Sequence, residues 1–85
     1  MAELLAGTRA LVTGASKGIG RAISAALVRE GAEVIGVARA SAELDGLAAE
    51  LGAAFAPWPL DVTGEEVLTR IAALDRLDLL VNNAG

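Results

Sequence analysis

The chain alternates short apolar runs with longer stretches in which apolar residues recur at helical spacing. The apolar runs cover Arg9–Thr13, Glu33–Val37, Ala54–Val62 and Asp78–Val81. The stretches between them place apolar residues on one helical face, at Ile19, Ala22, Ile23, Ala26 and Leu27, at Leu44, Leu47, Ala48 and Leu51, and at Val67, Ile71 and Leu74. Runs of β type that alternate with helical stretches are typical of βαβ units and a parallel sheet. The pattern therefore predicts an α/β fold with the element order βαβαβαβ.

Residues at the ends of the helical stretches match known helix start and stop signals. Gly31 suits the position after the first helix and Gly52 the end of the second, because glycine adopts the left-handed conformation that ends many helices. Ser41 is a good N-cap for the second helix. Thr63 and Glu66 have the spacing of a capping box, in which each side chain accepts a hydrogen bond from a backbone N–H. We therefore expect Thr63 to be the N-cap of the third helix.

Two prolines in the third apolar run predict where its strand lies in the sheet. Pro57 and Pro59 lack the N–H that a strand donates to its neighbour. Because alternate residues of a strand direct their backbone groups to the same side, both prolines can face the open side of an edge strand. In a doubly wound sheet of strand order 3-2-1-4 the third strand is at the edge, so the two indications agree. Trp58 between them is predicted to be apolar cover on this strand.

The fourth apolar run, with Leu79, Leu80 and Val81, reads as a strand that is buried in the middle of a sheet. No further run follows that could pair with its far side. We expect its native partner strands to be missing from residues 1–85 or to be supplied by another chain. Residues 1–85 would then be a single domain portion, truncated after Asn82–Gly85.

Composition narrows the chemistry that the chain can perform. Its 85 residues contain no cysteine and no histidine, which excludes disulfides, thiolate metal sites and histidine-based triads. The formal net charge of -4, with acids and bases interspersed, gives neither a basic stripe for nucleic acid nor a polybasic membrane anchor. Residues 1–5 have no basic region and too short an apolar run for a signal peptide or a membrane span. We expect a cytoplasmic protein without a metal site that binds neither nucleic acid nor membrane.

A glycine-rich segment joins the first predicted strand to the first helix with the spacing G-x-x-x-G-x-G. Gly14 permits a tight turn, Gly18 lets the backbone approach a pyrophosphate, and Gly20 lets the helix pack on the strand. N–H groups at the start of the helix can then bind phosphate. Lys17 precedes a glycine, so the segment lacks the Gly-Lys-Ser/Thr order that binds a triphosphate. Ser16 either touches a phosphate or stabilises the turn.

The glycine spacing and two further motifs resemble those of the classical short-chain dehydrogenases/reductases. Asp61-Val62 ends the third predicted strand, and the sequence Asn-Asn-Ala-Gly ends the fourth. The resemblance covers the whole chain and implies a Rossmann-type fold that binds a dinucleotide, with Asp61 at the adenine. The cofactor-binding residues that these motifs imply are Gly14, Ser16, Lys17, Gly18, Ile19, Gly20, Asp61, Val62, Asn83, Ala84 and Gly85. Two alternatives stay open: Asp61 can cap the third helix, and Asn82 and Asn83 can be structural amides.

Charge at the end of the second predicted strand indicates which cofactor is bound. A free ribose 2′-hydroxyl is usually bound there by an acid, but this strand ends Val37-Ala38-Arg39. Arg39 can bind a 2′-phosphate through two hydrogen bonds, and Lys17 adds a second positive charge. We therefore expect NADP(H) rather than NAD(H), as in the carbonyl and xylulose reductase branch of the family, which this segment resembles. The alternative is that Arg39 and Lys17 are solvated surface side chains.

The residues that perform the family's chemistry are not found in this chain. In the family a tyrosine exchanges the proton, a lysine four residues later lowers the tyrosine pKa, and serine and asparagine orient the carbonyl. Residues 1–85 contain no tyrosine, and their only lysine is Lys17. We therefore assign no catalytic residue and expect residues 1–85 alone to be inactive.

The resemblance thus predicts the NADP(H)-binding portion of an oxidoreductase that transfers hydride between NADPH and a carbonyl or alcohol substrate. Two alternatives remain. The chain can be a stand-alone nucleotide-binding or self-assembling module, in which copies pair through the fourth strand as a homo-oligomer. It can also be the product of a truncated reading frame without function.

Overall fold

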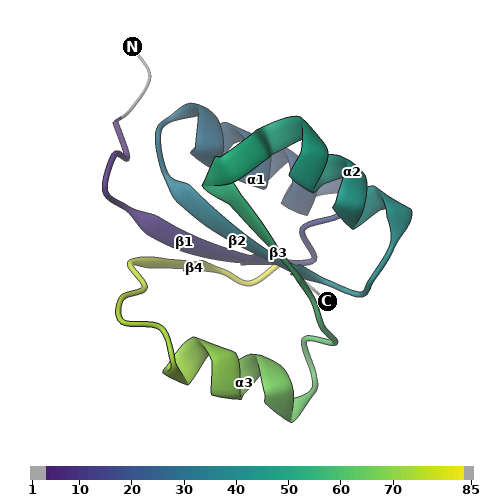
Figure 1. Ribbon diagram of the computed structural model, residues 1–85. Coiled ribbons are helices and arrows are strands. Elements are labelled where there is room, and N and C mark those ends of the chain that lie inside the picture. Colours follow the sequence, from purple (N-terminus) through teal and green to yellow (C-terminus); the bar gives the residue numbers. More distant parts are fainter. Residues whose placement is uncertain (1–3, 84–85) are drawn as a thin grey trace.

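The chain forms a four-stranded parallel sheet in the order β3-β2-β1-β4, with helices on both faces. A computed structural model describes residues 4–83 (Figure 1). The strands are β1 (Arg9–Thr13), β2 (Glu33–Ala38), β3 (Phe55–Pro59) and β4 (Leu79–Val81). The helices are α1 (Gly18–Arg29), α2 (Ala42–Leu51) and α3 (Glu65–Ala72), with a short 3-10 turn, η1 (Gly52–Ala54). The predicted α/β class, element order and strand order are therefore confirmed.

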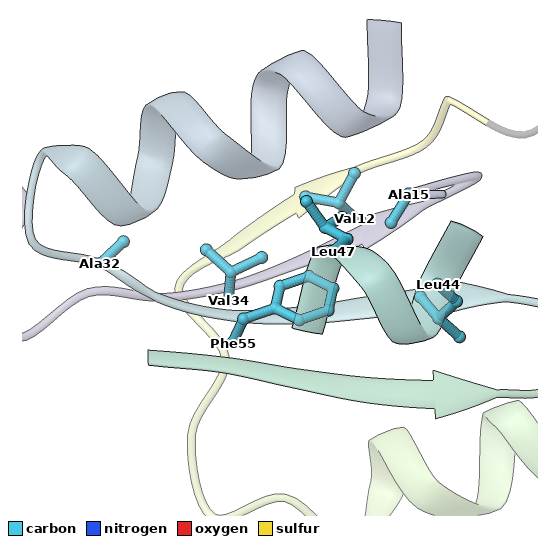
Figure 2. Close-up of a cluster of buried hydrophobic side chains, with 7 residues drawn as sticks. All are labelled: Val12, Ala15, Ala32, Val34, Leu44, Leu47 and Phe55. Atoms are coloured by element: carbon cyan, nitrogen blue, oxygen red, sulfur yellow. The ribbon is translucent and has the colours of Figure 1, made fainter. Parts of the chain in front are cut away.

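Alternate residues of the strands face two separate apolar layers. Val12, Val34 and Phe55 face α1 and α2 and form a buried cluster with Ala15, Ala32, Leu44 and Leu47 (Figure 2). Leu11, Ile35 and Val37 face the opposite side and pack with Val67 of α3. Figure 1 shows the same division, with α1 and α2 on one face of the sheet and α3 on the other. Burial on both faces explains why β1 and β2 are continuous apolar runs in the sequence.

The ends of the first two helices agree with the sequence signals. Gly31 has φ 96°, its N–H bonds the Val28 carbonyl at 3.0 Å, and the Ala32 N–H bonds the Leu27 carbonyl at 3.0 Å. These two bonds form the Schellman motif, so Gly31 is the predicted C′ residue. Ser41 is the N-cap of α2, where its Oγ accepts from the Leu44 N–H at 3.1 Å.

The predicted apolar face of α1 is wrong in its first turn. Ile19 is 70% exposed and Ala22 is also exposed, whereas the buried residues of α1 are Gly20 and Ser24. A Cβ atom on Gly20 would lie 2.0 Å from the Gly14 carbonyl oxygen. The helix thus meets β1 and its turn through small residues, and this close contact turns Ile19 away from the sheet. A search for periodic apolar residues cannot find the part of a helix face that consists of glycine and serine.

The third strand lies at the sheet edge, as predicted, but it is shorter than the apolar run that was expected to form it. β3 covers residues 55–59, and Pro57 and Pro59 pair in register with Gly36 and Ala38. The Leu60 N–H bonds the Ala38 carbonyl at 3.0 Å. Because backbone direction alternates along a strand, Leu60 faces β2 and both prolines face away from it. The missing N–H groups therefore interrupt no bond within the sheet.

The expected capping box at the start of α3 does not form. The N-cap is Gly64, and it makes no side-chain cap. The Thr63 hydroxyl and N–H instead donate to Oδ1 of Asp61, at 2.7 and 2.9 Å. Glu66 does not reach back to the cap and lies 3.9 Å from Arg70. A carboxylate two residues before Thr63 is a stronger acceptor than the position that the capping box offers, so Thr63 belongs to the preceding turn.

The fourth strand differs from the buried central strand that its apolar sequence predicted. β4 pairs with β1 on one side, and in the described residues it is the edge of the sheet. Leu79 is 39% exposed and Leu80 is 57% exposed. Within residues 4–83 no strand pairs with the far side of β4, and the strand carries exposed leucines.

An ionic network that the sequence did not predict joins the start of β1 to the segment between α3 and β4. The Arg9 guanidinium contacts Asp75 at 2.7 Å and Glu33 at 3.3 Å. The Arg9 backbone N–H bonds Oδ2 of Asp78 at 2.8 Å, and Arg76 bonds the same oxygen at 3.0 Å. The Arg9 N–H and the Arg76 guanidinium hold the pKa of Asp78 below its ordinary value. Arg9 holds the pKa of Asp75 low in the same way.

No helix within residues 4–83 has the length and apolar character that crossing a membrane requires.

Two glycines allow the packing of the larger buried cluster to be tested. A Cβ on Gly36 would lie 2.3 Å from Cζ of Phe55, whose ring is 4% exposed and cannot withdraw. We expect Gly36→Ala to lower the free energy of unfolding by about 1–3 kcal/mol through overpacking. Gly46 on α2 has no atom of another element within 4 Å of its Cβ position, so an added methyl group fits there. Because alanine favours a helix more than glycine does, Gly46→Ala should raise the free energy of unfolding by about 0.5–1 kcal/mol. Urea denaturation measures both, and a stabilising Gly36→Ala would contradict the packing described.

Acid should destabilise the fold through the ionic network. Asp75 and Asp78 have lower pKa values in the folded state than in the unfolded state. Their contribution to the free energy of unfolding is therefore complete at a pH above the unfolded-state pKa. It is lost as the pH falls through the folded-state pKa. We therefore expect stability to fall below about pH 4. Asp78→Asn should flatten this fall, whereas Asp45→Asn on the exposed surface of α2 should retain it. Chemical denaturation at a series of pH values provides the measurement, and equal acid profiles for the two variants would refute the assignment.

Candidate functional site

A cavity of about 490 Å³ opens at the carboxyl edge of the sheet, where β1, β2 and β3 end. Its lining comes from the turn after β1, from the end of β2 with the start of α2, and from the segment after β3. The lining residues are Gly14, Ser16, Lys17, Val37, Ala38, Arg39, Ser41, Glu43, Leu60, Asp61, Val62 and Thr63. The carboxyl edge is where open parallel α/β sheets bind their ligands.

The glycine-rich turn presents backbone to this edge of the sheet. Gly18 begins α1 with φ 55°, a conformation that side-chain-bearing residues rarely adopt, and no protein atom lies within 4 Å of its Cβ position. Lys17, the N-cap, makes no side-chain cap to the helix. The first N–H groups of a 12-residue helix thus begin beside open space, which suits an anionic ligand.

Gly20 has a different role from Gly18, because its neighbours are protein atoms. Its Cβ position lies 2.0 Å from the Gly14 carbonyl oxygen and 2.7 Å from Nδ2 of Asn83. Only a residue without a side chain fits there. The prediction that Gly20 allows α1 to pack closely on the first strand and its turn is therefore confirmed.

Thr13 and Asn83 join the end of β4 to the glycine-rich turn. The Thr13 hydroxyl oxygen accepts from the Asn83 N–H at 2.8 Å and lies 3.2 Å from Oδ1 of Asn82, to which it can donate. Nδ2 of Asn83 donates to the Gly14 carbonyl at 3.4 Å. Both amides thus make structural contacts, which is one of the two roles that the sequence left open. Thr13 was not among the predicted residues, although its buried hydroxyl connects the two motifs.

Asp61 orders the turn that leads into α3. Its Oδ1 accepts both bonds from Thr63, and its carbonyl accepts from the Gly64 N–H at 2.9 Å. The Thr63 hydroxyl holds the pKa of Asp61 below its ordinary value, and the Thr63 N–H and the charge of Arg39 act in the same direction. Asp61 is therefore an ionised carboxylate at the cavity wall at neutral pH. The alternative that Asp61 caps α3 is therefore wrong, because the N-cap is Gly64 and the Asp61 carboxylate binds Thr63 in the turn before the helix.

Two cations and two carboxylates share the cavity lining. Lys17 and Arg39 are exposed, and among residues 4–83 neither side chain makes a hydrogen bond or a salt bridge. Glu43 and Asp61 carry the opposing charges. The two cations are thus available to an anion that enters the cavity.

The structure brings together part of the predicted site. Gly14, Ser16, Lys17, Arg39, Asp61 and Val62 line the cavity. Gly18, Ile19 and Gly20 lie beside it at the start of α1, and Asn83 contacts the turn from the side of β4. Ala84 and Gly85 lie outside the described residues. The lining residues that sequence reasoning missed are Val37, Ala38, Ser41, Glu43, Leu60 and Thr63. Their position at the carboxyl ends of β2 and β3 was the signal that could have found them.

Two characterised proteins resemble the chain in sequence. Serine 3-dehydrogenase from Agrobacterium fabrum is 45% identical over 80 residues, which are 88% of this chain and 32% of that protein. The 3-oxoacyl-[acyl-carrier-protein] reductase FabG from Salmonella typhimurium is 48% identical over 84 residues, which are 93% of this chain and 34% of that protein. The chain therefore spans about a third of the length of these relatives.

A solved structure resembles it in fold. A short chain dehydrogenase from Shigella flexneri, complexed with NADP, superposes with a TM-score of 0.85 at 30% identity. The match covers 100% of this chain and 40% of the Shigella protein. The sheet described above is thus part of a larger Rossmann-type fold in that protein. Because the family model for short chain dehydrogenases also matches residues 8–85, this chain belongs to the short chain dehydrogenase family.

Proposed function

We propose that this chain is the NADP(H)-binding portion of a short-chain oxidoreductase that transfers hydride between NADPH and a carbonyl or alcohol substrate. The observation that carries the proposal is the cavity at the carboxyl edge, where the glycine-rich turn, Asp61 and the cations Lys17 and Arg39 line one space. The NADP complex of the Shigella relative supports the choice of cofactor. The carbonyl and xylulose reductase branch remains the branch that we propose from the sequence.

The residues present fit the parts of such a cofactor. The open space at Gly18 and the uncapped start of α1 would receive the pyrophosphate. Asp61 and Val62 would lie at the adenine, and Lys17 and Arg39 would bind the 2′-phosphate. Ile19, Asn83, Ala84 and Gly85 would contact the cofactor beyond the pyrophosphate. When bound, the cofactor supplies or accepts the hydride.

Catalysis itself we assign to residues outside this chain. Residues 1–85 have no tyrosine, and Lys17 belongs to the nucleotide cavity. No residue here can therefore be assigned as the general acid of the family. We therefore propose that residues 1–85 are a single dinucleotide-binding domain portion without turnover of its own.

A second candidate function is a nucleotide-binding module that assembles with copies of itself through β4. The observation that favours it is the exposure of Leu79 and Leu80 beside an unpaired strand edge in the described residues. Sedimentation of the purified chain separates the two candidates. A discrete dimer or larger species supports the self-assembling module, whereas a monomer that aggregates supports a portion of a larger enzyme.

The 2′-phosphate assignment can be tested with nucleotides that represent the adenosine half of the cofactor. Adenosine 2′,5′-bisphosphate carries the 2′-phosphate, and 5′-AMP lacks it. We expect Arg39→Ala to weaken binding of the bisphosphate about tenfold or more, because a charge-assisted hydrogen bond contributes about 1.5–3 kcal/mol. Binding of 5′-AMP should change less than about threefold, since it lacks the group that Arg39 would bind. Calorimetric titration of the chain measures both dissociation constants.

Arg29→Ala provides the control for this titration. Arg29 is an exposed arginine in the last turn of α1 and does not line the cavity. Arg29→Ala changes the net charge of the chain by the same amount as Arg39→Ala, so an effect of net charge alone on nucleotide binding would appear in both variants. Equal weakening of the two nucleotides by Arg39→Ala would remove the basis for an NADP(H) preference.

A further inference from the structure

Glu43 places a carboxylate in the cavity that we propose for the 2′-phosphate. It is the second residue of α2, its side chain is exposed, and it lines the cavity together with Lys17 and Arg39. An anion that these two cations attract is therefore also exposed to the charge of Glu43.

The two carboxylates of the cavity differ in what else they bind. Asp61 accepts two hydrogen bonds from Thr63 and so is fixed in the turn before α3. The Glu43 side chain makes no hydrogen bond or salt bridge within residues 4–83. Its removal would thus change the charge of the cavity without disrupting the cavity wall.

Glu43 has a structural effect that opposes its effect on an anion. As an acid in the first turn of α2, it interacts favourably with the positive end of the helix dipole. The same negative charge repels a phosphate bound near that end. Glu43 therefore raises the stability of the helix and lowers the affinity of the cavity for a phosphate.

We propose that Glu43 is a specificity-determining residue, which weakens binding of nucleotides that carry a 2′-phosphate and so narrows the preference for NADP(H) over NAD(H). The inference rests on the proposed function, because it requires the 2′-phosphate to lie between Lys17 and Arg39. A phosphate with nearly two negative charges is repelled by the carboxylate, whereas a neutral 2′-hydroxyl is not. Acids at this edge also accept hydrogen bonds from a free 2′-hydroxyl.

Glu43→Gln tests the proposal with the same two nucleotides. We expect adenosine 2′,5′-bisphosphate to bind about three- to tenfold more tightly to the variant at low salt, because a surface charge acts over a few ångströms at reduced dielectric. Binding of 5′-AMP should change by less than about twofold, and added salt should shrink the gain for the bisphosphate. Urea denaturation of the same variant should show a small loss of stability.

Glu66→Gln is the matched control. Glu66 is also the exposed second residue of a helix, α3, but it lies outside the cavity. The control loses the same charge at the same helical position and should leave both dissociation constants unchanged. Equal gains in Glu43→Gln and Glu66→Gln would overturn the proposal, since the effect would then come from net charge.

The outcomes also separate this inference from the proposed function. If Arg39→Ala removes the preference for the bisphosphate while Glu43→Gln leaves it unaltered, the proposed function stands and the role of Glu43 fails. If the unmodified chain binds 5′-AMP and the bisphosphate equally, the 2′-phosphate assignment fails and the role of Glu43 fails with it.

Discussion

The contact between the glycine-rich turn and α1 is the constraint on which the rest of the site depends. The space at Gly20 is closed by the Gly14 carbonyl and the Asn83 amide, so the glycine-rich segment and the residues after β4, which are far apart in sequence, meet at a position that has no side chain. This contact brings the start of α1 against β1 and turns Ile19 outward. It also fixes the turn from which Ser16 and Lys17 reach the cavity. Packing within the protein therefore sets the position of the backbone that we propose for binding the pyrophosphate.

The cavity combines backbone that hydrogen bonds hold in place with charged side chains that lack such bonds. Its floor consists of strand ends and a turn that are held by hydrogen bonds, among them those of Asp61. Its charged groups include three long side chains, Lys17, Arg39 and Glu43, and none of these side chains makes a hydrogen bond or a salt bridge in the described part of the chain. Under the proposed function, the backbone would recognise the shape of the ligand, whereas these side chains, which substitution can change at little cost to the fold, would discriminate between related anions.

Sequence reasoning recovered the sheet because burial on both faces leaves a direct trace in the apolar runs of β1 and β2. The prolines of β3 lack a backbone N–H and therefore favour an edge strand. The position of β3 in the strand order could be predicted for this reason. Two of the failures have a common physical cause. The start of α1 packs through Gly20 and Ser24, and the Arg9 network joins residues up to 69 positions apart, so neither produces a periodic pattern of apolar residues. Thr63 failed as a cap because a nearby carboxylate competed for its hydroxyl.

Because of the prolines of β3, the two edges of the sheet differ in how well they can pair with a further strand. Of the backbone positions 55, 57 and 59 that face away from β2, the last two are prolines and offer no N–H. A strand that approached this edge would find few donors, whereas the edge beside β4 has its full complement. Within the described residues, a further strand is therefore disfavoured beside β3 and can pair beside β4, and two sheets joined by their β4 edges would expose prolines at both ends. Such a pair would resist extension into a fibre.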